Sequence, residues 1–251
     1  MYKAAIEISP VVKYTRILRA FAAPRPLVGG GAGREISRTF RVFDHEVAEG
    51  VEGFITIAGG KMCTSRLMAE RLSDVVAKKL GLKANCRTHI EPLPGAEDEI
   101  DIEEVARKYS LYNALISRTV HRWGTLVNEF LPETQKTPEL KSMVCTCEMV
   151  TVAEIKYALK KTWAIGVKDL RRRCRVTAGT CQGQNCSFKV ASLIHEFTGR
   201  PVEKVLDDLA ETLRGRWLGN MEVLFEDQLR QASLMLSIYN CLGNFDRLFG
   251  M

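Results

Sequence analysis

Several features that would place the chain in a particular class are absent from its sequence. No apolar run approaches the ~18–20 uninterrupted residues that a membrane-spanning helix needs, and no apolar stretch follows the N-terminal lysine. We therefore predict neither a transmembrane segment nor a signal peptide. Internal repeats and low-complexity tracts are also lacking, and 46% hydrophobic and 26% charged residues are typical of a globular protein. We expect a cytoplasmic protein, attached to the inner face of a membrane at most through partners.

Positive charge is in moderate excess, with a formal net charge of +6, and much of it lies between Lys168 and Arg175. Such a run is most often a solvated face and sometimes binds phosphate or nucleic acid. No aromatic platform or recognition motif accompanies it, so nucleic-acid binding is not predicted. A dinucleotide-binding G-x-G-x-x-G motif is missing too, because Arg34 follows the glycines of residues 29–33 where a last glycine is needed.

The chain has eight cysteines and no recognisable export signal. Cysteines in a reducing compartment more often bind metal or do redox chemistry than form a disulfide framework. Two close pairs stand out, Cys145-x-Cys147 and Cys181-x4-Cys186. The others are scattered, and we expect them to be small core residues. These are Cys63, Cys86, Cys174 and Cys241.

The spacing of the paired cysteines favours a metal over a disulfide. In an extended Cys-x-Cys segment both sulfurs point to one side, with Cα atoms roughly 6.5–7 Å apart, at the upper limit for a disulfide. Structural zinc usually takes wider hooks, often with histidine, and neither hook here contains a histidine. The loop between Cys181 and Cys186 contains Gly183 and offers several backbone N–H donors, which sulfides and thiolates need.

The surrounding charge favours an iron–sulfur cluster at these cysteines. Two ferric ions, two sulfides and four thiolates together are anionic, and reduction adds a further negative charge. Lys168 and the arginines of 171–175 precede the second pair, and the helix expected after Cys186 directs its positive N-terminus toward it. We predict that the four paired cysteines hold a [2Fe–2S] cluster, with zinc ligation and unmetallated core cysteines as alternatives.

Hydrophobic patterns predict an α+β fold with a mostly helical C-terminal part. We expect short extended segments and loops over residues 1–50, a buried strand over 53–60, and a helix from Thr64 to Leu80 that Gly81 ends. Further helices are predicted over 101–131 with a break near Gly124, from a Thr151–Glu154 capping box to Lys161, from Cys186 to Thr198, from Pro201 onward, and over 226–242.

The chain resembles a known family in several segments. VCTCE (144–148), DLRRR (169–173) and GTCQGQNC (179–186) resemble the [2Fe–2S] domain of the bacterioferritin-associated ferredoxin type, in the version fused to FAD-dependent dehydrogenases. Other segments resemble the large FAD-dependent subunit of anaerobic glycerol-3-phosphate dehydrogenases: TRILRAF (15–21), RPL (25–27), DH (44–45), GFITIAGGK (53–61), RLMAE (66–70) and RW (216–217). The likeness extends over nearly the whole chain.

This resemblance implies a flavin and a substrate site near the Gly-Gly-Lys segment. Gly59, Gly60, Lys61 and Thr64 would contribute to FAD binding. Lys61 would also, with Arg25, reach an acidic substrate. A strand, a glycine pair and a helix N-terminus in this order expose backbone donors to an anionic or electron-rich ligand. Without the resemblance, the glycines are a simple tight turn and the two cations are surface charges.

The chain also departs from the family pattern. Ala23-Pro24 and the residues of 62–66 replace family residues beside the presumed substrate pocket, so the substrate stays open. The N-terminal glycine-rich element that holds the FAD pyrophosphate is absent, which implies either that a partner flavoprotein supplies it or that the flavin site is vestigial. No general base is predicted; His45 is the nearest candidate, and a structural histidine is the alternative.

We accordingly predict an iron–sulfur electron-transfer subunit of a FAD-dependent dehydrogenase that acts on glycerol 3-phosphate or a related hydroxy or amino acid. It would relay electrons from the shared FAD to further iron–sulfur or quinone-linked subunits. The alternative is an assembly or regulatory subunit with a structural cluster and no flavin contact. The predicted parts are a flavin and substrate portion (1–90), a helical connector (91–142), the [2Fe–2S] domain (143–199) and a helical tail (200–251).

Overall fold

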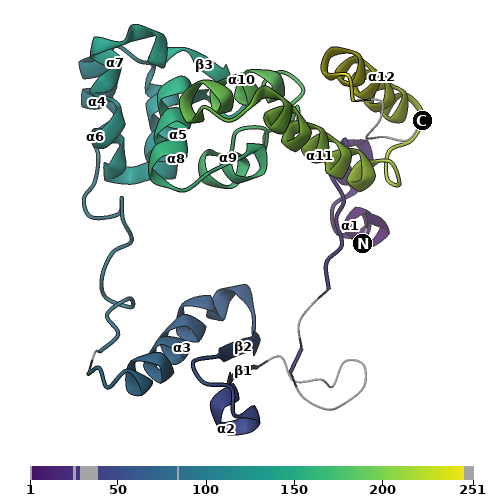
Figure 1. The fold of residues 1–251 in the computed structure, drawn as a ribbon. Helices are drawn as coiled ribbons and strands as arrows, with labels where there is room; N and C mark the ends of the chain where they lie inside the picture. The colour runs from purple at the N-terminus through teal and green to yellow at the C-terminus, as the bar shows by residue number, and fades with distance from the viewer. Residues whose placement is uncertain (1, 25–26, 29–38, 84, 246–251) are drawn as a thin grey trace. The chain divides into compact units, whose positions relative to one another are not determined.

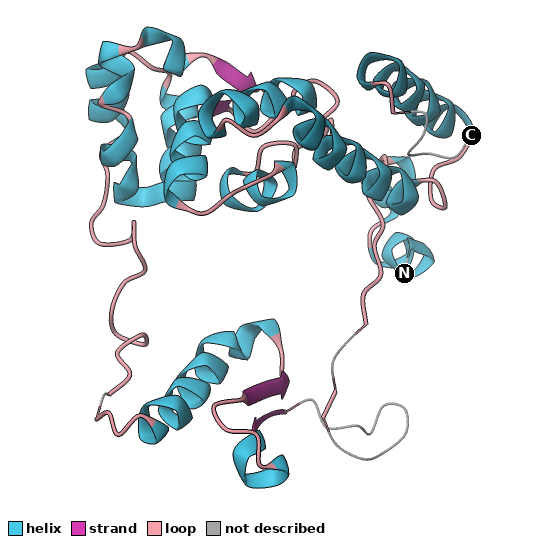
Figure 2. Cartoon of the chain, viewed as in Figure 1, coloured by secondary structure: helices cyan, strands magenta, loops and turns pink. Residues whose placement is uncertain are grey.

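A computed structural model describes residues 2–24, 27–28, 39–83 and 85–245 of the chain. The chain divides into two compact units, a larger one of Met1–Phe21 with Pro94–Met251 and a smaller one of Ala22–Leu93. Helices predominate, and the described residues form sheet only as two short antiparallel pairs (Figure 1, Figure 2). The predicted mostly helical α+β class is confirmed.

The smaller unit is an antiparallel strand pair with helices around it. Its elements are β1 (Phe40–Asp44), α2 (His45–Glu49), β2 (Ile55–Gly59), η3 (Met62–Thr64) and α3 (Ser65–Lys79). Phe40 lies opposite Gly59 and Asp44 opposite Ile55. Helix α3 contacts both strands, and Lys79 at its end forms an ion pair with Asp44 at 2.9 Å.

No described residue of the smaller unit is fully buried. The strand predicted over 53–60 exists as β2, but its side chains are only partly buried, so the prediction of a buried strand is wrong. A two-stranded pair with one covering helix leaves its other face open to solvent. Large apolar side chains that are exposed here include Val47, Phe54, Met62 and Leu80.

The N-terminal 50 residues contain more helix than the loops and extended segments predicted for them. Helix α1 (Tyr2–Ile8) in the larger unit and helix α2 both contradict that prediction. Local signals mark α2: the Asp44 side chain accepts a hydrogen bond from the Glu46 N–H, and Gly50 follows the helix with a φ of 72°.

The larger unit is helical apart from one short strand pair. In chain order after α1 it contains η1 (Pro10–Tyr14), α4 (Ile102–Tyr109), α5 (Asn113–Trp123), η4 (Gly124–Leu126), α6 (Val127–Phe130), α7 (Glu133–Lys136), η5 (Pro138–Lys141), β3 (Met143–Cys145), β4 (Val150–Thr151), α8 (Val152–Lys161), α9 (Val167–Cys174), α10 (Ser187–Thr198), α11 (Val202–Asn220) and α12 (Glu226–Gly243). Among the described residues, no helix combines the length and apolar character that crossing a membrane requires.

Several helix ends lie where sequence signals predict them. Thr151 Oγ1 accepts a hydrogen bond from the Glu154 N–H and begins α8, and Gly199, with a φ of 68°, follows the last residue of α10. The helix predicted over 101–131 is broken at Gly124 as expected, and also at Ser110, which has a left-handed φ of 53°. Gly124 has no room for a side chain because its backbone lies against Gly95, whose carbonyl accepts the Thr125 N–H.

The hydrophobic core of the larger unit lies around α8. This helix contacts α9, α10, α6, β4 and η5. Fully buried apolar side chains from these and neighbouring elements fill the space between them, including Ile116, Val127, Val150, Ile155, Leu170, Ile194 and Leu209.

A buried ion pair joins α5 to α8 within this core. Arg122 Nε and Nη2 donate to the two carboxylate oxygens of Glu154 at 2.7 and 2.8 Å, and the side chains are 4% and 0% exposed. The guanidinium also donates to the carbonyls of Glu148 and Met149, at 3.0 and 3.1 Å. Burial raises the pKa of Glu154, and Arg122 opposes this rise. The predicted Thr151–Glu154 capping box is therefore only half formed, since this carboxylate serves Arg122 instead of the helix end.

Removing one partner of this pair should strongly destabilise the larger unit. Arg122→Met leaves a buried carboxylate without a counter-charge, and we expect a loss of about 3–5 kcal/mol in the free energy of unfolding. Denaturant titration followed by circular dichroism measures the loss. The double variant Arg122→Met/Glu154→Leu should lose much less than the two single variants together, because no unpaired charge stays buried. Additive losses would contradict this account.

Candidate metal centre

Two segments of the larger unit bring the four paired cysteines together. Cys145 ends strand β3 and Cys147 lies in the turn before β4, while Cys181 and Cys186 lie in the turn that leads into α10. The Sγ atoms of Cys145 and Cys147 are 3.9 Å apart, and those of Cys147 and Cys181 are 3.3 Å apart. The thiols of Cys145 and Cys186 are also hydrogen-bonded. The four sulfurs thus form one contiguous group.

Backbone N–H groups donate to these sulfurs from both segments. Those of Glu148 and Thr177 reach the Cys145 sulfur, that of Thr177 also reaches Cys186, that of Cys181 reaches Cys147, and those of Gly183 and Asn185 reach Cys181. Such donors stabilise thiolate charge and the sulfur of metal clusters. The second segment can turn tightly enough because Gly183 adopts a φ of 87°, which glycine does without steric cost.

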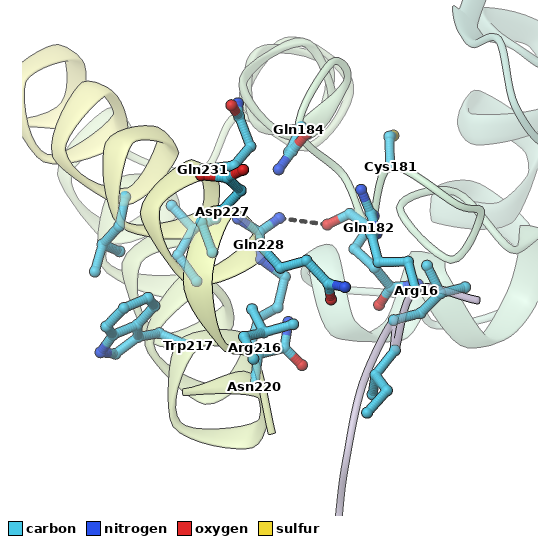
Figure 3. Close-up of a pocket in the computed structure, with 16 residues that line it drawn as sticks. Arg16, Cys181, Gln182, Gln184, Arg216, Trp217, Asn220, Asp227, Gln228 and Gln231 are labelled. Carbon is cyan, nitrogen blue, oxygen red and sulfur yellow. Dashed lines mark hydrogen bonds between the residues drawn. The ribbon is translucent and has the colours of Figure 1, made fainter. Parts of the chain in front are cut away.

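Three carbonyl groups of the second cysteine loop (residues 180–186) accept hydrogen bonds from side chains outside the loop. Arg16 Nη2 donates to the Thr180 carbonyl at 2.7 Å, Arg216 donates to the Gln182 carbonyl (Figure 3), and the Tyr239 hydroxyl donates to the Gln184 carbonyl. The C=O and N–H of one planar trans peptide point in opposite directions. Each held carbonyl therefore directs the next N–H, of Cys181, Gly183 or Asn185, toward a sulfur.

The basic run from Lys168 to Arg175 places fewer cationic side chains against the cysteine loops than its position in the sequence suggests. Arg171 donates to the Thr177 carbonyl and to Gln182 Oε1, and Arg175 pairs with Glu148 at 3.0 Å. Lys168 and Arg172 instead form ion pairs near the surface, with Glu211 at 3.4 Å and with Asp169 at 3.5 Å, respectively. Arg16 and Arg216, whose role here sequence reasoning missed, come from elsewhere in the chain. Both lie in segments that carry the family resemblance, but nothing near them in the sequence predicts contact with the cysteine loop.

Because the four thiols lie close together, their pKa values differ from one another. The hydrogen bond with Cys186, helped by the N–H donors, lowers the pKa of Cys145 to about 5. Burial and the bond to Cys181 raise the pKa of Cys147 to about 11, and the bond to Cys145 and burial raise that of Cys186. Burial opposes ionisation of Cys181, but the Asn185 N–H, the Cys147 thiol and the Gly183 N–H together lower the pKa of this thiol. In each hydrogen-bonded pair, Cys145 with Cys186 and Cys147 with Cys181, one thiolate is thus stabilised at the expense of the other. Ligation of a cationic metal centre would allow all four to ionise.

The donor set suits a thiolate-ligated metal group. Two thiolates on one tetrahedral ion lie roughly 3.8 Å apart when the metal–sulfur bonds are about 2.3 Å. The Cys145–Cys147 separation of 3.9 Å agrees with this value, whereas the Cys147–Cys181 separation of 3.3 Å is shorter. Across the described part of the chain, no three or more Cys, His, Asp or Glu side chains are arranged to hold a single metal ion. A [2Fe–2S] cluster places different demands on its ligands, because two irons share the four thiolates.

A cavity of about 350 Å³ opens beside Cys181 (Figure 3). Residues 16–18, the second cysteine loop and helices α11 and α12 line it. Asn220 Oδ1 and Gln228 Oε1 are buried here without a hydrogen-bond partner.

The four cysteines differ in exposure. Cys145 and Cys186 are 1% exposed, whereas Cys147 and Cys181 are only partly buried. The sulfur group is therefore accessible along one edge.

The scattered cysteines do not all behave as predicted. Cys174 is a buried core residue, as expected, and donates to the Leu170 carbonyl at 3.1 Å; burial raises its pKa. Cys63 and Cys241 are exposed, so the prediction of core positions is wrong for them. Cys63 lies in the three-residue η3, which has no buried residue, and Cys241 lies on the solvent face of α12, which the apolar pattern alone did not distinguish. Cys86 is partly buried, with its sulfur 3.0 Å from Thr88 Oγ1.

The predicted flavin residues lie together at the end of β2. Gly59 and Gly60 have φ values of 83° and 77°, and side chains there would collide with the Thr39 carbonyl and with Met68. The Thr64 hydroxyl donates to the Lys61 carbonyl at 2.8 Å, so the chain itself uses it. Lys61 is exposed. The flavin and substrate roles stay predictions, and Arg25 lies outside the described residues.

His45 has both ring nitrogens engaged. Nδ1 lies 2.6 Å from Glu49 Oε2 and Nε2 lies 2.8 Å from Thr56 Oγ1, while the ring packs on Phe54 with centroids 4.8 Å apart. These contacts give His45 a structural role, in which its side chain joins α2 to β2.

Comparison with known proteins finds similarity to glycerophosphate-oxidising enzymes. The family model for the C-terminal domain of alpha-glycerophosphate oxidase matches residues 86–203. This match includes Cys145, Cys147, Cys181 and Cys186. No solved structure matches the chain significantly.

Two of the curated relatives of the chain are subunits of one particular enzyme. The chain is 36% identical over 244 residues to one subunit of the anaerobic glycerol-3-phosphate dehydrogenase of Escherichia coli K12, covering 96% of this chain and 44% of that protein. It is 34% identical over 252 residues to one subunit of the Haloferax volcanii enzyme, covering 98% and 42%. The chain thus spans less than half the length of these relatives. It is homologous to the C-terminal region of glycerol-3-phosphate dehydrogenase subunits, which belong to an oxidoreductase.

The held carbonyls predict a role for Tyr239 in metal affinity. Tyr239→Phe frees the Gln184 carbonyl and loosens the Asn185 N–H that faces Cys181, so affinity for a thiolate-bound metal should fall about two- to tenfold, the equivalent of one hydrogen bond. Titration of the reduced, metal-free chain with Co²⁺, followed by thiolate charge-transfer absorption, measures this.

Tyr157→Phe is the matched control for this titration. Its hydroxyl donates to Glu129 at 3.1 Å, away from the cysteines, so the variant should bind Co²⁺ like the wild type. Equal losses in the two variants would show that Tyr239 acts only through general stability.

Proposed function

We propose that the chain is the iron–sulfur part of a FAD-dependent dehydrogenase related to anaerobic glycerol-3-phosphate dehydrogenase. In this proposal Cys145, Cys147, Cys181 and Cys186 hold a [2Fe–2S] cluster in a domain of the bacterioferritin-associated ferredoxin type over residues 143–199. The observation that carries it is the convergence of four thiols that receive backbone N–H hydrogen bonds. When bound, the cluster supplies one-electron transfer between a flavin and later carriers.

The surrounding residues suit such a relay. Cys145 and Cys186 are sealed in the core, which keeps water from one side of the sulfur group. Cys147 and Cys181 lie at the accessible edge, where a redox partner can approach. Arg171 and Arg216, which hold the second loop, place positive charge beside the thiolates, and this favours the reduced, more negative state.

Metal analysis tests the cluster. Anaerobically purified chain should contain two irons and two sulfides per chain, as a [2Fe–2S] centre requires, with a rhombic EPR signal after reduction. Cys181→Ser should lose most of the iron, because a ligand is removed. The exposed Cys241→Ser should keep it.

Stoichiometric zinc without iron would overturn the cluster proposal and favour a structural zinc site. Iron retained equally in Cys181→Ser and Cys241→Ser would mean that the iron lies elsewhere in the chain.

We further propose that the smaller unit completes a flavin pocket with a partner flavoprotein chain. None of its described residues is fully buried, and several large apolar side chains are exposed. Both features suit a layer that packs on another domain. Gly59, Gly60 and Thr64 would adjoin FAD, and Lys61 with Arg25 would bind an acidic substrate such as glycerol 3-phosphate or a related hydroxy or amino acid. Electrons would continue to iron–sulfur or quinone-linked subunits, through which the complex associates with the cytoplasmic face of a membrane.

Purification of a tagged chain from its native cell tests this arrangement. A flavin-containing polypeptide should co-purify and reduce an artificial acceptor when glycerol 3-phosphate is added. In that complex Lys61→Ala should raise KM about tenfold or more, because a charged hydrogen bond to the substrate is lost. Lys78→Ala, an exposed lysine on α3, should leave KM unchanged. Absence of any flavoprotein, or equal effects of the two variants, would contradict the shared pocket.

A further inference from the structure

Residues 15–21, which we call the strap, belong to the larger unit but contain neither helix nor strand. The strap is fixed to the rest of that unit at two points. Arg16 Nη2 donates to the Thr180 carbonyl at 2.7 Å, and the Ala20 N–H donates to the Gly219 carbonyl at 3.0 Å. The strap therefore runs from the second cysteine loop to helix α11.

The attachment to α11 leaves no space for a side chain at Gly219. A Cβ atom there would lie 2.7 Å from the Ala20 carbonyl oxygen, closer than such atoms approach one another in proteins. One turn earlier in the same helix, a Cβ atom at Gly215 would meet no atom within 4 Å. Alanine favours a helix at both positions, but only at Gly219 would it displace the strap.

The attachment to the cysteine loop acts on a sulfur atom. Because Arg16 holds the Thr180 carbonyl, the N–H of the same peptide, that of Cys181, donates to the Cys147 sulfur. Arg16 is exposed, so packing around its side chain does not fix its direction. Its direction depends instead on where the strap holds its backbone. Displacement of the strap would loosen the hydrogen bond to the Cys147 sulfur.

The strap also brings a positive charge toward the centre. Burial lowers the pKa of both Arg171 and Arg216, and repulsion from Arg19 contributes in each. The Arg19 charge thus acts on the two arginines that hold the second cysteine loop. Hydrogen bonds to the sulfurs and positive charge beside them both stabilise the reduced, more negative state of a cluster.

We propose that the strap holds the sulfur group in its metal-binding arrangement and so raises the reduction potential of the cluster, with Arg16 as the positioning residue. The strap continues at Ala22 into the smaller unit, so that unit is joined to the centre through this residue. The effect on the potential rests on the cluster proposed above. The effect on the thiols applies to any metal that they bind.

Redox titration of the full chain, followed by EPR, measures the effect on the potential. Gly219→Ala changes no charge and should lower the equilibrium constant for reduction about tenfold, which is about 59 mV for a one-electron couple and equals one charge-assisted hydrogen bond. Gly215→Ala should leave the potential unchanged. Hydrogen exchange of the Ala20 N–H should be faster in Gly219→Ala alone, because this variant releases the strap.

Variants of Arg16 test the other attachment in the same titration. Arg16→Met should lower the potential at least as much as Gly219→Ala does. Arg16→Lys should restore most of the loss, because an ammonium group also donates to a carbonyl. An unchanged potential in Arg16→Met or Gly219→Ala, or equal shifts in Gly219→Ala and Gly215→Ala, would overturn the proposal.

Co²⁺ titration of the reduced, metal-free chain separates this proposal from that of the cluster. Gly219→Ala should weaken Co²⁺ binding about two- to tenfold, the equivalent of one hydrogen bond, and Gly215→Ala should bind like the wild type. A chain without iron would overturn the cluster and leave this comparison valid. Equal Co²⁺ affinities of Gly219→Ala and the wild type would overturn the role of the strap, whichever metal the chain holds.

Discussion

Arg122 and Glu154 exchange two charge-assisted hydrogen bonds inside the helical core, where neither charge reaches water. Such a pair is costly to bury, and it persists only when every donor and acceptor is satisfied. Arg122 meets this requirement by donating also to the carbonyls of Glu148 and Met149. These carbonyls belong to the turn after Cys147. The buried pair therefore ties α5 to α8 and at the same time fixes the turn of the first cysteine pair.

The second cysteine pair depends on the same kind of interaction, made by side chains from outside its loop. Arg16, Arg216 and Tyr239 each bind a carbonyl of the loop, and each bound peptide presents its N–H to a sulfur. Cations thus do two things at this centre. They orient the backbone dipoles toward the sulfurs and they lower the electrostatic cost of holding several thiolates together.

The two units of the chain differ in how far they can support themselves. The larger unit has a continuous core around α8, with members from Ala106 to Phe245. The described part of the smaller unit buries no residue fully, although its strands are paired in full register. Backbone pairing without a buried layer contributes little net stability, because most of the free energy comes from apolar burial. The described part of the smaller unit therefore gains little stability from its own packing.

Local interactions explain what the sequence alone could predict. The close spacing of the cysteine pairs, the Thr151 cap and the Gly199 stop each depend on residues a few positions apart, so their geometry can be derived from the printed order. The helical content and the spacing within each cysteine pair follow from such signals, whereas the contact of Cys147 with Cys181 joins residues far apart in the chain. Only tertiary structure decided which cations serve the centre. Arg16 meets Thr180 across 164 positions, and the nearby basic run is mostly drawn to other partners. Burial was likewise undecided, since an apolar pattern shows which face can be covered but not whether another layer is there to cover it.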